Sequence, residues 1–454
     1  MKKITGRSAF LSILQSEGVT HLFGNPGTTE LPIMHALKEY PDIKYILGLQ
    51  EAIVVAMADG YSRATGKLSA CNVHVAPGLG NAMGAIYNAK FVGSPIIITA
   101  GQQEQGHGLM EPMLYGPLVR MAEPLVKWAT EVNRLEDLPR IMRRAAKIAL
   151  SPPTGPVFIS LPGDILNKEA KIDLGKPTRV IDTYRPSHNS IELIAKKISK
   201  YKKPVIIAGH EVATSGAFKE ITMFAEYTGS AVYQQTVPHG SHYPSEHMAF
   251  MGTLPRLQKP TKNILENYDL LICVGCDGLR MSVWSDTEPL PSKMPIIHIG
   301  INEWEIGKNY STELAIIGNV KNTLNDINQY LKNTLSSEET LKAKKRLKLI
   351  AKNNWNVKKK SLTAKTMHDK LKKPITPNWL MMNIANNITK NNIVVEEGLV
   401  STRTLLNYLP YKNNNDFYGL ASGGIGWAVS GAIGVSLANP SKTIVAIIGD
   451  GSSM

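Results

Sequence analysis

The sequence has few cysteines and no long apolar run. Three cysteines among 454 residues exclude the disulfide framework of a small secreted protein and are typical of a chain in a reducing cytoplasm. No run of about 18 apolar residues occurs, so we expect no membrane-spanning helix. A hydrophobic content of 43% with 19% charged residues is typical of an ordinary globular protein. At this length the chain can form about three domains.

Positive charge is concentrated in one segment. The net charge is +14, but residues 342–373 hold 13 Lys or Arg against one acid, Asp369, which accounts for +12 of that total. A basic amphipathic helix of this kind can bind an anionic membrane or RNA. We favour a solvated linker between two domains, because the remaining chain is close to neutral. We therefore expect neither nucleic acid nor a membrane as a partner.

Strand-like and helix-like patterns alternate on both sides of this basic segment. We predict three α/β domains, each with a doubly wound parallel sheet, because alternating strands and helices form that architecture. The expected boundaries are 1–175 for the first domain, 188–335 for the central domain, 336–375 for the basic linker and 376–454 for the last domain. We expect the last domain to be incomplete, since its final strand runs directly into the end of the chain.

The chain ends in a strand pattern followed by a Gly-Asp-Gly-Ser turn. Residues 444–448 are apolar and mostly β-branched, as a buried parallel strand requires. In open α/β sheets, ligands bind beyond the carboxyl ends of the strands, where glycine N–H groups approach phosphate and a carboxylate can hold Mg²⁺. Asp450, between Gly449 and Gly451, has that place. An ordinary Asp-Gly turn is the alternative.

A second carboxylate lies at a strand-to-helix junction near the start of the chain. Glu51 follows a short apolar strand pattern at 45–49 and opens a helix with apolar residues on one face. On its own, such a glutamate is usually a helix N-terminal charge. Here a second strand, a Gly-rich turn and a helix of small residues follow at 72–89, in the sequence NVHVAPGLGNAMGAIYNA. The combination favours a functional carboxylate.

Seven motifs follow one another along nearly the whole chain. They are GNPGTTELP from Gly24, LQEA with Glu51, ADGYSRATGK, NVHVAPGLGNAMGA, GQQ from Gly101, ASGGIGWAVSGAIGV and GDGSS. With them the chain resembles the thiamine-diphosphate enzymes, and among these it looks most like the benzoylformate decarboxylases. The resemblance implies thiamine diphosphate and Mg²⁺ as cofactors, and a homodimer or homotetramer with sites at the subunit interface. It also implies non-oxidative decarboxylation of a 2-oxo acid to an aldehyde and CO₂.

The resemblance assigns cofactor binding to one residue of the first domain and six of the last. Glu51 matches the glutamate that hydrogen-bonds the pyrimidine ring, and Ile425 matches the bulky residue that holds the cofactor in a bent form. Asp450 matches a Mg²⁺ ligand whose partner, an Asn further along, would lie beyond Met454, so we expect the chain to be truncated there. The full set is Glu51, Gly424, Ile425, Gly449, Asp450, Gly451 and Ser452.

The catalytic residues implied by the resemblance are Glu51, His74 and Thr28, but the match is partial. His74 matches an active-site histidine that transfers protons near neutral pH. Thr28 replaces a serine that contacts the substrate carboxylate, and its added methyl group narrows the pocket. Ser282 stands where the family has a second histidine. Either water, His74 or Arg280 supplies that proton, or the substrate differs from an aryl 2-oxo acid, which is the explanation we favour.

Two other functions are consistent with the same motifs. The first is a carboligase similar to the acetolactate synthases, which often keep FAD in the central domain. The second is a non-catalytic homologue with a structural or regulatory role. The missing half of the metal motif and the serine at position 282 support this hypothesis. Glu51, His74 and Asp450 argue against the second, because a scaffold has no physical need for a carboxylate at the pyrimidine position.

Other groups of polar residues are interpreted as mainly structural. Cys273 and Cys276 form a C-x-x-C motif, but no second pair follows, so packing at a strand end is favoured over zinc binding. His107, on the loop after GQQ, is a candidate for the border of a substrate channel. The spacing of three further histidines suits a loop better than one face of a helix. These residues are His239, His242 and His247.

Overall fold

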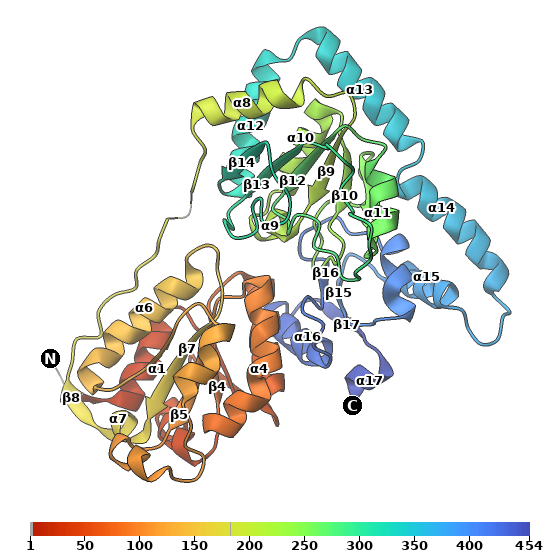
Figure 1. Ribbon diagram of the computed structural model, residues 1–454. Helices are drawn as coiled ribbons and strands as arrows, with labels where there is room; N and C mark the ends of the chain where they lie inside the picture. The colour runs from red at the N-terminus through yellow and green to blue at the C-terminus, as the bar shows by residue number, and fades with distance from the viewer. Residues whose placement is uncertain (1–2, 182) are drawn as a thin grey trace. The chain divides into compact units, whose positions relative to one another are not determined.

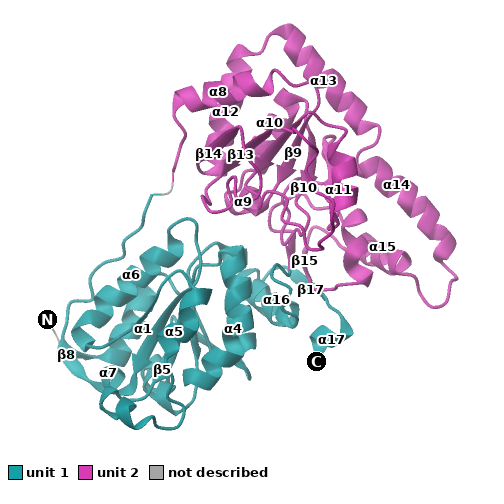
Figure 2. Ribbon diagram, viewed as in Figure 1, with its two compact units in different colours: residues 1–181, 420–454 teal, residues 182–419 magenta. Residues whose placement is uncertain are grey.

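The computed structural model describes residues 3–181 and 183–454, in which strands and helices alternate along the chain (Figure 1). The chain divides into two units (Figure 2). The first comprises Met1–Ile181 and Leu420–Met454, and the second comprises Asp182–Gly419. In the described part of the chain, no helix is both long and apolar enough to cross a membrane.

The first unit contains a six-stranded parallel sheet. Its strands are β2 (His21–Gly24), β3 (Lys44–Leu47), β4 (Ser69–Val73), β5 (Ile96–Gln102), β6 (Ala129–Glu131) and β7 (Val157–Pro162). Their order is β3-β2-β4-β5-β7-β6, and all neighbours are parallel. The chain goes from β2 to β3 on one side, whereas β4 lies on the other side. The connections after β2 and β4 therefore diverge, which leaves space at their carboxyl ends for a ligand.

Helices cover both faces of this sheet. Side chains alternate along each strand, so that Leu22 packs in one apolar cluster and Phe23 in the other, as do Ala70 and Cys71. One face is covered by α1 (Gly6–Ser16), α2 (Leu31–Ala36), α6 (Leu138–Leu150) and α7 (Gly163–Asn167). The other is covered by α3 (Glu51–Thr65), α4 (Val75–Val92) and α5 (Leu118–Ala122). β1 (Lys3–Thr5) and β8 (Glu169–Lys171) form a separate antiparallel pair.

The last segment of the first unit packs against α3. It consists of α16 (Trp427–Ala438), β17 (Thr443–Ile447) and α17 (Asp450–Ser453). Glycines allow α3 and α16 to approach closely, since a Cβ added to Gly60 would lie 2.1 Å from the carbonyl oxygen of Gly431. A Cβ added to Gly434 would likewise lie 2.0 Å from the carbonyl oxygen of Met57. The two backbones are therefore in direct contact.

The second unit contains another six-stranded parallel sheet. Its strands are β9 (Pro204–Ala208), β10 (Ala231–Gln234), β11 (Phe250–Thr253), β12 (Leu270–Val274), β13 (Ile296–Gly300) and β14 (Leu314–Ile317). The order is β11-β10-β9-β12-β13-β14, which places a switch point between β9 and β12. One face is covered by α8 (His188–Ile198), α9 (His210–Thr214), α10 (Phe218–Thr228) and α12 (Val320–Thr334), and the other by α11 (Gln258–Leu265).

The basic segment of the chain is helical and packed. It forms α13 (Ser337–Ala351) and α14 (Trp355–Thr366). Ala343, Leu347 and Trp355 are buried, the last two in an apolar cluster of the second unit, and Arg346 donates a hydrogen bond of 2.7 Å to the carbonyl of Thr228. These contacts give the helices one buried face, while most of the lysines remain in solvent. The segment is therefore not a wholly solvated tether.

The remaining elements of the second unit are α15 (Pro377–Asn387) and the parallel pair β15 (Asn392–Glu396) and β16 (Phe417–Gly419). The predicted fold class is confirmed, because parallel sheets flanked by helices make up both units. Individual elements are shifted by a few residues from their predicted bounds. The strand predicted at 45–49 is β3, and the helix predicted from Ile191 to Lys200 is α8.

Candidate active site

The predicted catalytic residues lie beyond the carboxyl ends of three neighbouring strands. Thr28 comes shortly after β2, His74 follows β4, and Glu51 begins α3 shortly after β3. Because β3, β2 and β4 are adjacent and parallel, their carboxyl ends meet at one edge of the sheet. This edge includes the switch point, where ligands bind in doubly wound folds. Glu51 and His74, which are remote in sequence from each other, are thereby brought to one place.

Glu51 is held by two asparagine side chains. Its carboxylate is buried, and Oε1 accepts a hydrogen bond of 3.0 Å from Nδ2 of Asn25, while Oε2 accepts one of 3.0 Å from Nδ2 of Asn81. The helix itself is capped by Gln50, whose side chain accepts from the backbone N–H of Ala52. Each carboxylate oxygen has two acceptor sites, so Glu51 can still accept a hydrogen bond from a ligand.

His74 is hydrogen-bonded to Glu30. Its Nδ1 lies 2.7 Å from Oε2 of Glu30, whose side chain is fully buried, whereas the imidazole is 22% exposed. Glu30 ends a short 3₁₀ helix, η1 (Thr28–Glu30), directly after the Gly24–Gly27 loop. The imidazole thus has one nitrogen fixed in the protein interior and a surface open to solvent.

Two further features of this edge concern Thr28 and Val75. Thr28 begins η1 and is exposed, so its hydroxyl is available to a ligand. Val75, directly after His74, is buried with a φ of 41°. A positive φ in a β-branched residue is a backbone outlier that costs on the order of 1–3 kcal/mol, and such strain is often found beside active sites. The strain fixes the direction in which the chain presents the imidazole.

The Gly-rich turn before α16 is anchored to α4. Oδ1 of Asn88 accepts from the backbone N–H groups at 421–422, at 3.4 and 3.2 Å. Gly423 and Gly426 have φ values of +84° and +92°, which glycine adopts without strain. Between them Ile425 is 60% exposed, so a large apolar side chain is presented to solvent at this turn.

The terminal Gly-Asp-Gly-Ser motif forms a strand-to-helix turn as predicted. Asp450 is the first residue of α17 and is exposed, with Gly449 as its extended N-cap. The backbone N–H of Ser452 donates to the carbonyl of Gly449 at 3.2 Å. Among residues 3–181 and 183–454, no three His, Cys, Asp or Glu side chains are grouped so that they could hold a metal ion. Within this part of the chain Asp450 is a single carboxylate rather than a complete metal site.

Comparison with known proteins identifies the family of the chain. Models of the N-terminal, central and C-terminal domains of thiamine pyrophosphate enzymes match residues 4–113, 191–327 and 400–454. A probable acetolactate synthase large subunit of Methanocaldococcus jannaschii is 30% identical over 474 residues, covering 98% of this chain and 76% of that protein. The chain belongs to the thiamine pyrophosphate enzyme family.

Two groups of this family are similar to the chain: benzoylformate decarboxylases and acetolactate synthases. Benzoylformate decarboxylase of Pseudomonas aeruginosa is 28% identical over 453 residues, which cover 99% of this chain and 81% of that protein. The structure of a thiamine diphosphate-dependent 4-hydroxybenzoylformate decarboxylase from Rhodococcus jostii RHA1 aligns with a TM-score of 0.86 at 27% identity, covering 99% of this chain and 82% of that one. Decarboxylases and acetolactate synthases are therefore both close relatives of this thiamine pyrophosphate enzyme.

Sequence reasoning missed three residues of the site, Glu30, Asn25 and Asn81. Glu30 contacts His74, and the two asparagines hold Glu51. One signal for Glu30 was available, since an acid three residues after Gly27 fits the pattern in which a side chain reaches back to the N-terminal backbone of a helix. Glu30 does accept from the N–H of Gly27, at 2.9 Å. Asn25 and Asn81 lie within the motifs GNPGTTELP and NVHVAPGLGNAMGA, but their contacts with Glu51 depend on tertiary structure.

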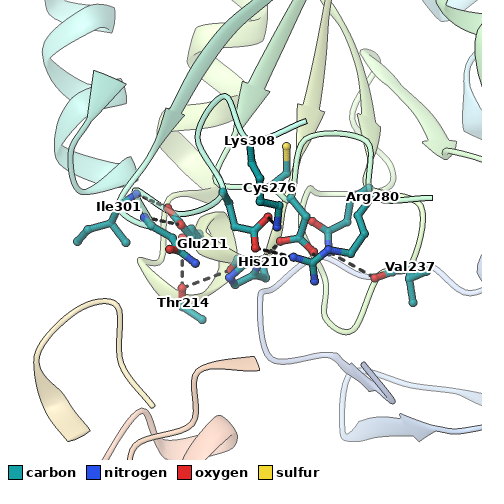
Figure 3. Close-up of polar contacts among 12 residues, drawn as sticks. His210, Glu211, Thr214, Val237, Cys276, Arg280, Ile301 and Lys308 are labelled. Carbon is teal, nitrogen blue, oxygen red and sulfur yellow. Dashed lines mark hydrogen bonds and ion pairs between the residues drawn. The ribbon is translucent and has the colours of Figure 1, made fainter. Parts of the chain in front are cut away.

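Arg280, considered above as a substitute proton donor, is held by two carboxylates in the second unit (Figure 3). Its Nη2 lies 2.5 Å from Oε1 of Glu305, and its Nη1 lies 3.5 Å from Oδ2 of Asp277. Ser282, which follows shortly after Arg280 in the sequence, is exposed. A guanidinium bound in this way is a poor proton donor, because it is already stabilised as a cation.

The remaining cysteines and histidines are placed as structural residues or surface residues. Cys273 and Cys276 are free and buried, and their mutual contact together with burial raises the pKa of Cys276. His239 and His242 are buried in a loop of the second unit. His107 is exposed in η3 (Gln105–Met110), on the loop after β5. Among the described residues, no three His, Cys, Asp or Glu side chains are grouped as metal ligands.

Proposed function

We propose that this protein decarboxylates a 2-oxo acid, without oxidation, to an aldehyde and CO₂, using thiamine diphosphate and Mg²⁺. The observation that carries the proposal is the shared position of Glu51 and the His74–Glu30 pair at one edge of the first sheet. A carboxylate that orients a cofactor and an imidazole that moves protons are the two groups such a reaction needs from the protein. The names of two relatives, which act on benzoylformate or its 4-hydroxy derivative, support a 2-oxo acid as the substrate.

The environment of Glu51 fits the pyrimidine part of the cofactor. Beside the carboxylate lies Gly78, where an added Cβ would be 2.9 Å from Oε1, so the glycine keeps this space open. When bound, thiamine diphosphate supplies a carbon nucleophile that adds to the substrate carbonyl and takes up the electron pair left by CO₂. Glu51 would hold the pyrimidine ring by a hydrogen bond and so fix its orientation.

The last segment supplies groups suited to the other half of the cofactor. Ile425, exposed beside Gly424, would support the bent cofactor through apolar contact. Asp450 would bind Mg²⁺, with phosphate oxygens and water completing the oxygen ligands that this ion prefers. The N–H groups at Gly449–Ser452 would approach phosphate at the start of α17. The family's sites lie between subunits, so we propose a homodimer or homotetramer.

His74 is the group we assign to proton transfer at the substrate. It is partly exposed at the switch point, whereas Arg280 is bound by two carboxylates. The exposed hydroxyl of Thr28 would bind the substrate carboxylate. With Ser282 in place of a second histidine, either His74 alone serves both proton transfers or the substrate differs from an aryl 2-oxo acid, and we favour the second explanation. Three buried, free cysteines are consistent with a cytoplasmic enzyme.

A carboligase is the alternative, since an acetolactate synthase subunit is 30% identical to the chain. Acetolactate synthases often carry FAD, whose phosphates would bind backbone N–H groups near the switch point of the central sheet. In this protein the buried carboxylate of Glu211, which follows β9, accepts from the backbone N–H groups of Ile301 at 2.8 Å and Asn302 at 3.3 Å, directly after β13 (Figure 3). Burial raises the pKa of Glu211, while His210 and these two N–H groups oppose the rise. We propose the decarboxylase, and we expect it to carry no flavin.

The decarboxylase and the carboligase would differ in their products and in the flavin absorbance of the purified protein. The purified protein, with thiamine diphosphate and Mg²⁺ added, is assayed on a panel of 2-oxo acids for CO₂, aldehyde and acetohydroxy acid. We expect CO₂ and aldehyde in equal amounts, and no flavin absorbance in the purified protein. Acetohydroxy acid as the main product together with bound flavin would establish the carboligase instead. A non-catalytic homologue would release no CO₂ from any member of the panel.

A further inference from the structure

We propose that Glu30 is a positioning residue, which fixes the proton of neutral His74 on Nδ1 and leaves Nε2 as the nitrogen that faces the ligand. This inference rests on the proposed function for the role of His74 in turnover. Its structural part, the location of the proton, stands on the contacts around Glu30 alone. Those contacts involve two motifs of the sequence, GNPGTTELP and GQQ, which no cofactor role has so far explained.

The carboxylate of Glu30 is surrounded by hydrogen-bond donors. Oε1 accepts from the backbone N–H of Gly101 at 2.8 Å and from the hydroxyl of Thr29 at 2.7 Å. Oε2 accepts from the backbone N–H of Gly27 at 2.9 Å and lies 2.7 Å from Nδ1 of His74. Two of these partners are amide groups that can only donate. An ionised carboxylate can only accept, and four donors satisfy its four acceptor sites.

This arrangement decides which ring nitrogen of His74 carries the proton. In neutral imidazole, one nitrogen donates and the other accepts. An unprotonated Nδ1 would face the acceptor Oε2 of Glu30 at 2.7 Å with no proton between them. The hydroxyl of Thr29 is also near Nδ1, at 3.4 Å, but it already donates to Oε1 of Glu30 at the shorter distance of 2.7 Å. Nδ1 is therefore the donor, and Nε2 has the free electron pair.

Two glycines make room for this pair. A Cβ added to Gly27 would lie 2.1 Å from Cε1 of His74, and one added to Gly101 would lie 2.1 Å from Oε1 of Glu30. Neither distance allows a side chain without displacement of the His74–Glu30 pair. The strained φ of Val75 fixes the backbone on the other side of the imidazole. The ring is thus held by a buried hydrogen bond, by steric limits and by its own backbone.

The positioning of His74 matters because the protein has Ser282 where its relatives' motif has a second histidine. An imidazole transfers protons when its reacting nitrogen has the correct protonation state and is directed at the reacting atom. Glu30 keeps Nδ1 engaged, so that one defined nitrogen, Nε2, remains for both accepting and returning a proton. In this respect Glu30 acts on His74 as the buried carboxylate of a hydrolase triad acts on its histidine.

The direct test is ¹⁵N NMR of the full chain labelled at histidine, above about pH 8, where an ordinary imidazole is neutral. The His74 signals are identified by their loss in His74→Gln. We expect the chemical shift of a protonated nitrogen for Nδ1 and of an unprotonated nitrogen for Nε2. The opposite assignment in the wild-type protein would overturn the proposal. Because this readout needs no substrate, it remains decisive even if the protein decarboxylates none of the acids tested.

Glu30→Ala tests the functional part. Without the carboxylate we expect the proton to move to Nε2 and kcat to fall by roughly 10²-fold, the usual effect of losing acid–base catalysis, with the affinity for thiamine diphosphate unchanged. The matched control is Glu17→Ala. Glu17 is equally buried and pairs with Arg143 and Arg179, but it lies near the amino end of β2, at the opposite edge of the sheet.

The control separates positioning from stability. Glu17→Ala should lower the thermal midpoint, like Glu30→Ala, but leave the His74 signals and kcat as in the wild-type protein. If Glu30→Ala does not fold, Glu30→Gln replaces it. In one orientation the NH₂ group of the new amide faces the backbone N–H of Gly101, and in the other it faces the backbone N–H of Gly27. Either orientation places two hydrogen-bond donors against each other. Wild-type kcat in a folded Glu30 variant whose Nδ1 has lost its proton would refute the positioning role, and so would a proton that stays on Nδ1 in Glu30→Ala.

Discussion

The indole Nε1 of Trp427 donates a hydrogen bond of 2.7 Å to the carboxylate of Asp59, 368 residues earlier in the chain. Asp59 is fully buried and also accepts from Asn88, at 2.9 Å, and from Ser94. The guanidinium of Arg63 lies 4.6 Å from the centre of the Trp427 ring. Burial raises the pKa of Asp59, while Arg63 and the three donors oppose that rise. One carboxylate thus joins α3, α4 and α16.

Asp59→Ala should therefore be strongly destabilising. The substitution removes the acceptor of three buried hydrogen bonds, and each buried donor left without a partner costs about 1–3 kcal/mol. Urea unfolding measures the change. Asp42→Ala is the control, since Asp42 is exposed and accepts one hydrogen bond from Gln15. Equal effects of the two substitutions would show that the buried network contributes little.

A methyl group at Gly60 should disrupt the contact between α3 and α16. The added Cβ would lie 2.1 Å from the carbonyl oxygen of Gly431, so we expect Gly60→Ala to destabilise the protein by about 1–3 kcal/mol or more. Gly84→Ala is the matched control, because Gly84 lies within α4 and a Cβ added there would have no atom within 4 Å. Alanine is the better helix former, so this control should gain roughly 0.5–1 kcal/mol. A stabilised Gly60→Ala would contradict the close helix contact.

Glu396 gives the stability of the second unit a pH dependence. Burial raises the pKa of Glu396 from its ordinary 4.5 to about 7, and hydrogen bonds from Thr402 and Gly398 oppose the rise. The folded state therefore binds more protons than the unfolded state between these values, and stability falls as pH rises through about 4.5 to 7.

Glu396→Gln should remove this dependence. Each pKa unit corresponds to about 1.4 kcal/mol, so we expect a gain of about 1–3 kcal/mol above pH 7 and none near pH 4.5. Thermal midpoints of the two proteins, recorded across that range, provide the measurement. Exposed Glu338 serves as the control position, where Gln should have no such effect. A midpoint difference that does not vary with pH would show that Glu396 is ionised throughout.

Much of the candidate site could be predicted because its key residues lie in local motifs. Glu51 at the start of a helix and His74 after a buried strand each have a recognisable sequence context, and alternation of strands and helices fixes where their strand ends lie. That the two meet at one edge follows from the order of β3, β2 and β4. The alternation of strand-like and helix-like patterns likewise predicted the fold class.

The parts that could not be predicted depend on contacts between distant segments. Glu30 receives hydrogen bonds from Gly27 and Gly101, which are brought together only by the pairing of strands. Trp427 meets Asp59 only because glycines let α3 and α16 touch. The basic segment was expected to be solvated, since its charge hides the spacing of Leu347 and Trp355, which pack against the central core.

Glu51→Gln should abolish turnover without affecting folding. The amide keeps the size of the side chain but loses the charge and one acceptor oxygen, so its contacts with Asn25 and Asn81 cannot both be retained. We expect kcat to fall by at least roughly 10²-fold, with the thermal midpoint changed by less than that of Asp59→Ala. Glu39→Gln, an exposed position in the same unit, should retain full activity. Unchanged turnover in Glu51→Gln would refute the assigned role.

The most direct test of the proposed function is CO₂ release from 2-oxo acids labelled with ¹³C in the carboxylate. The protein is incubated with each acid in the presence and absence of thiamine diphosphate and Mg²⁺, and the labelled CO₂ and the aldehyde are measured together. We predict that at least one acid yields both products in equal amounts only when both cofactors are present, and that Glu51→Gln yields neither. Release of CO₂ that does not depend on thiamine diphosphate, or no release from any acid, would contradict the proposal.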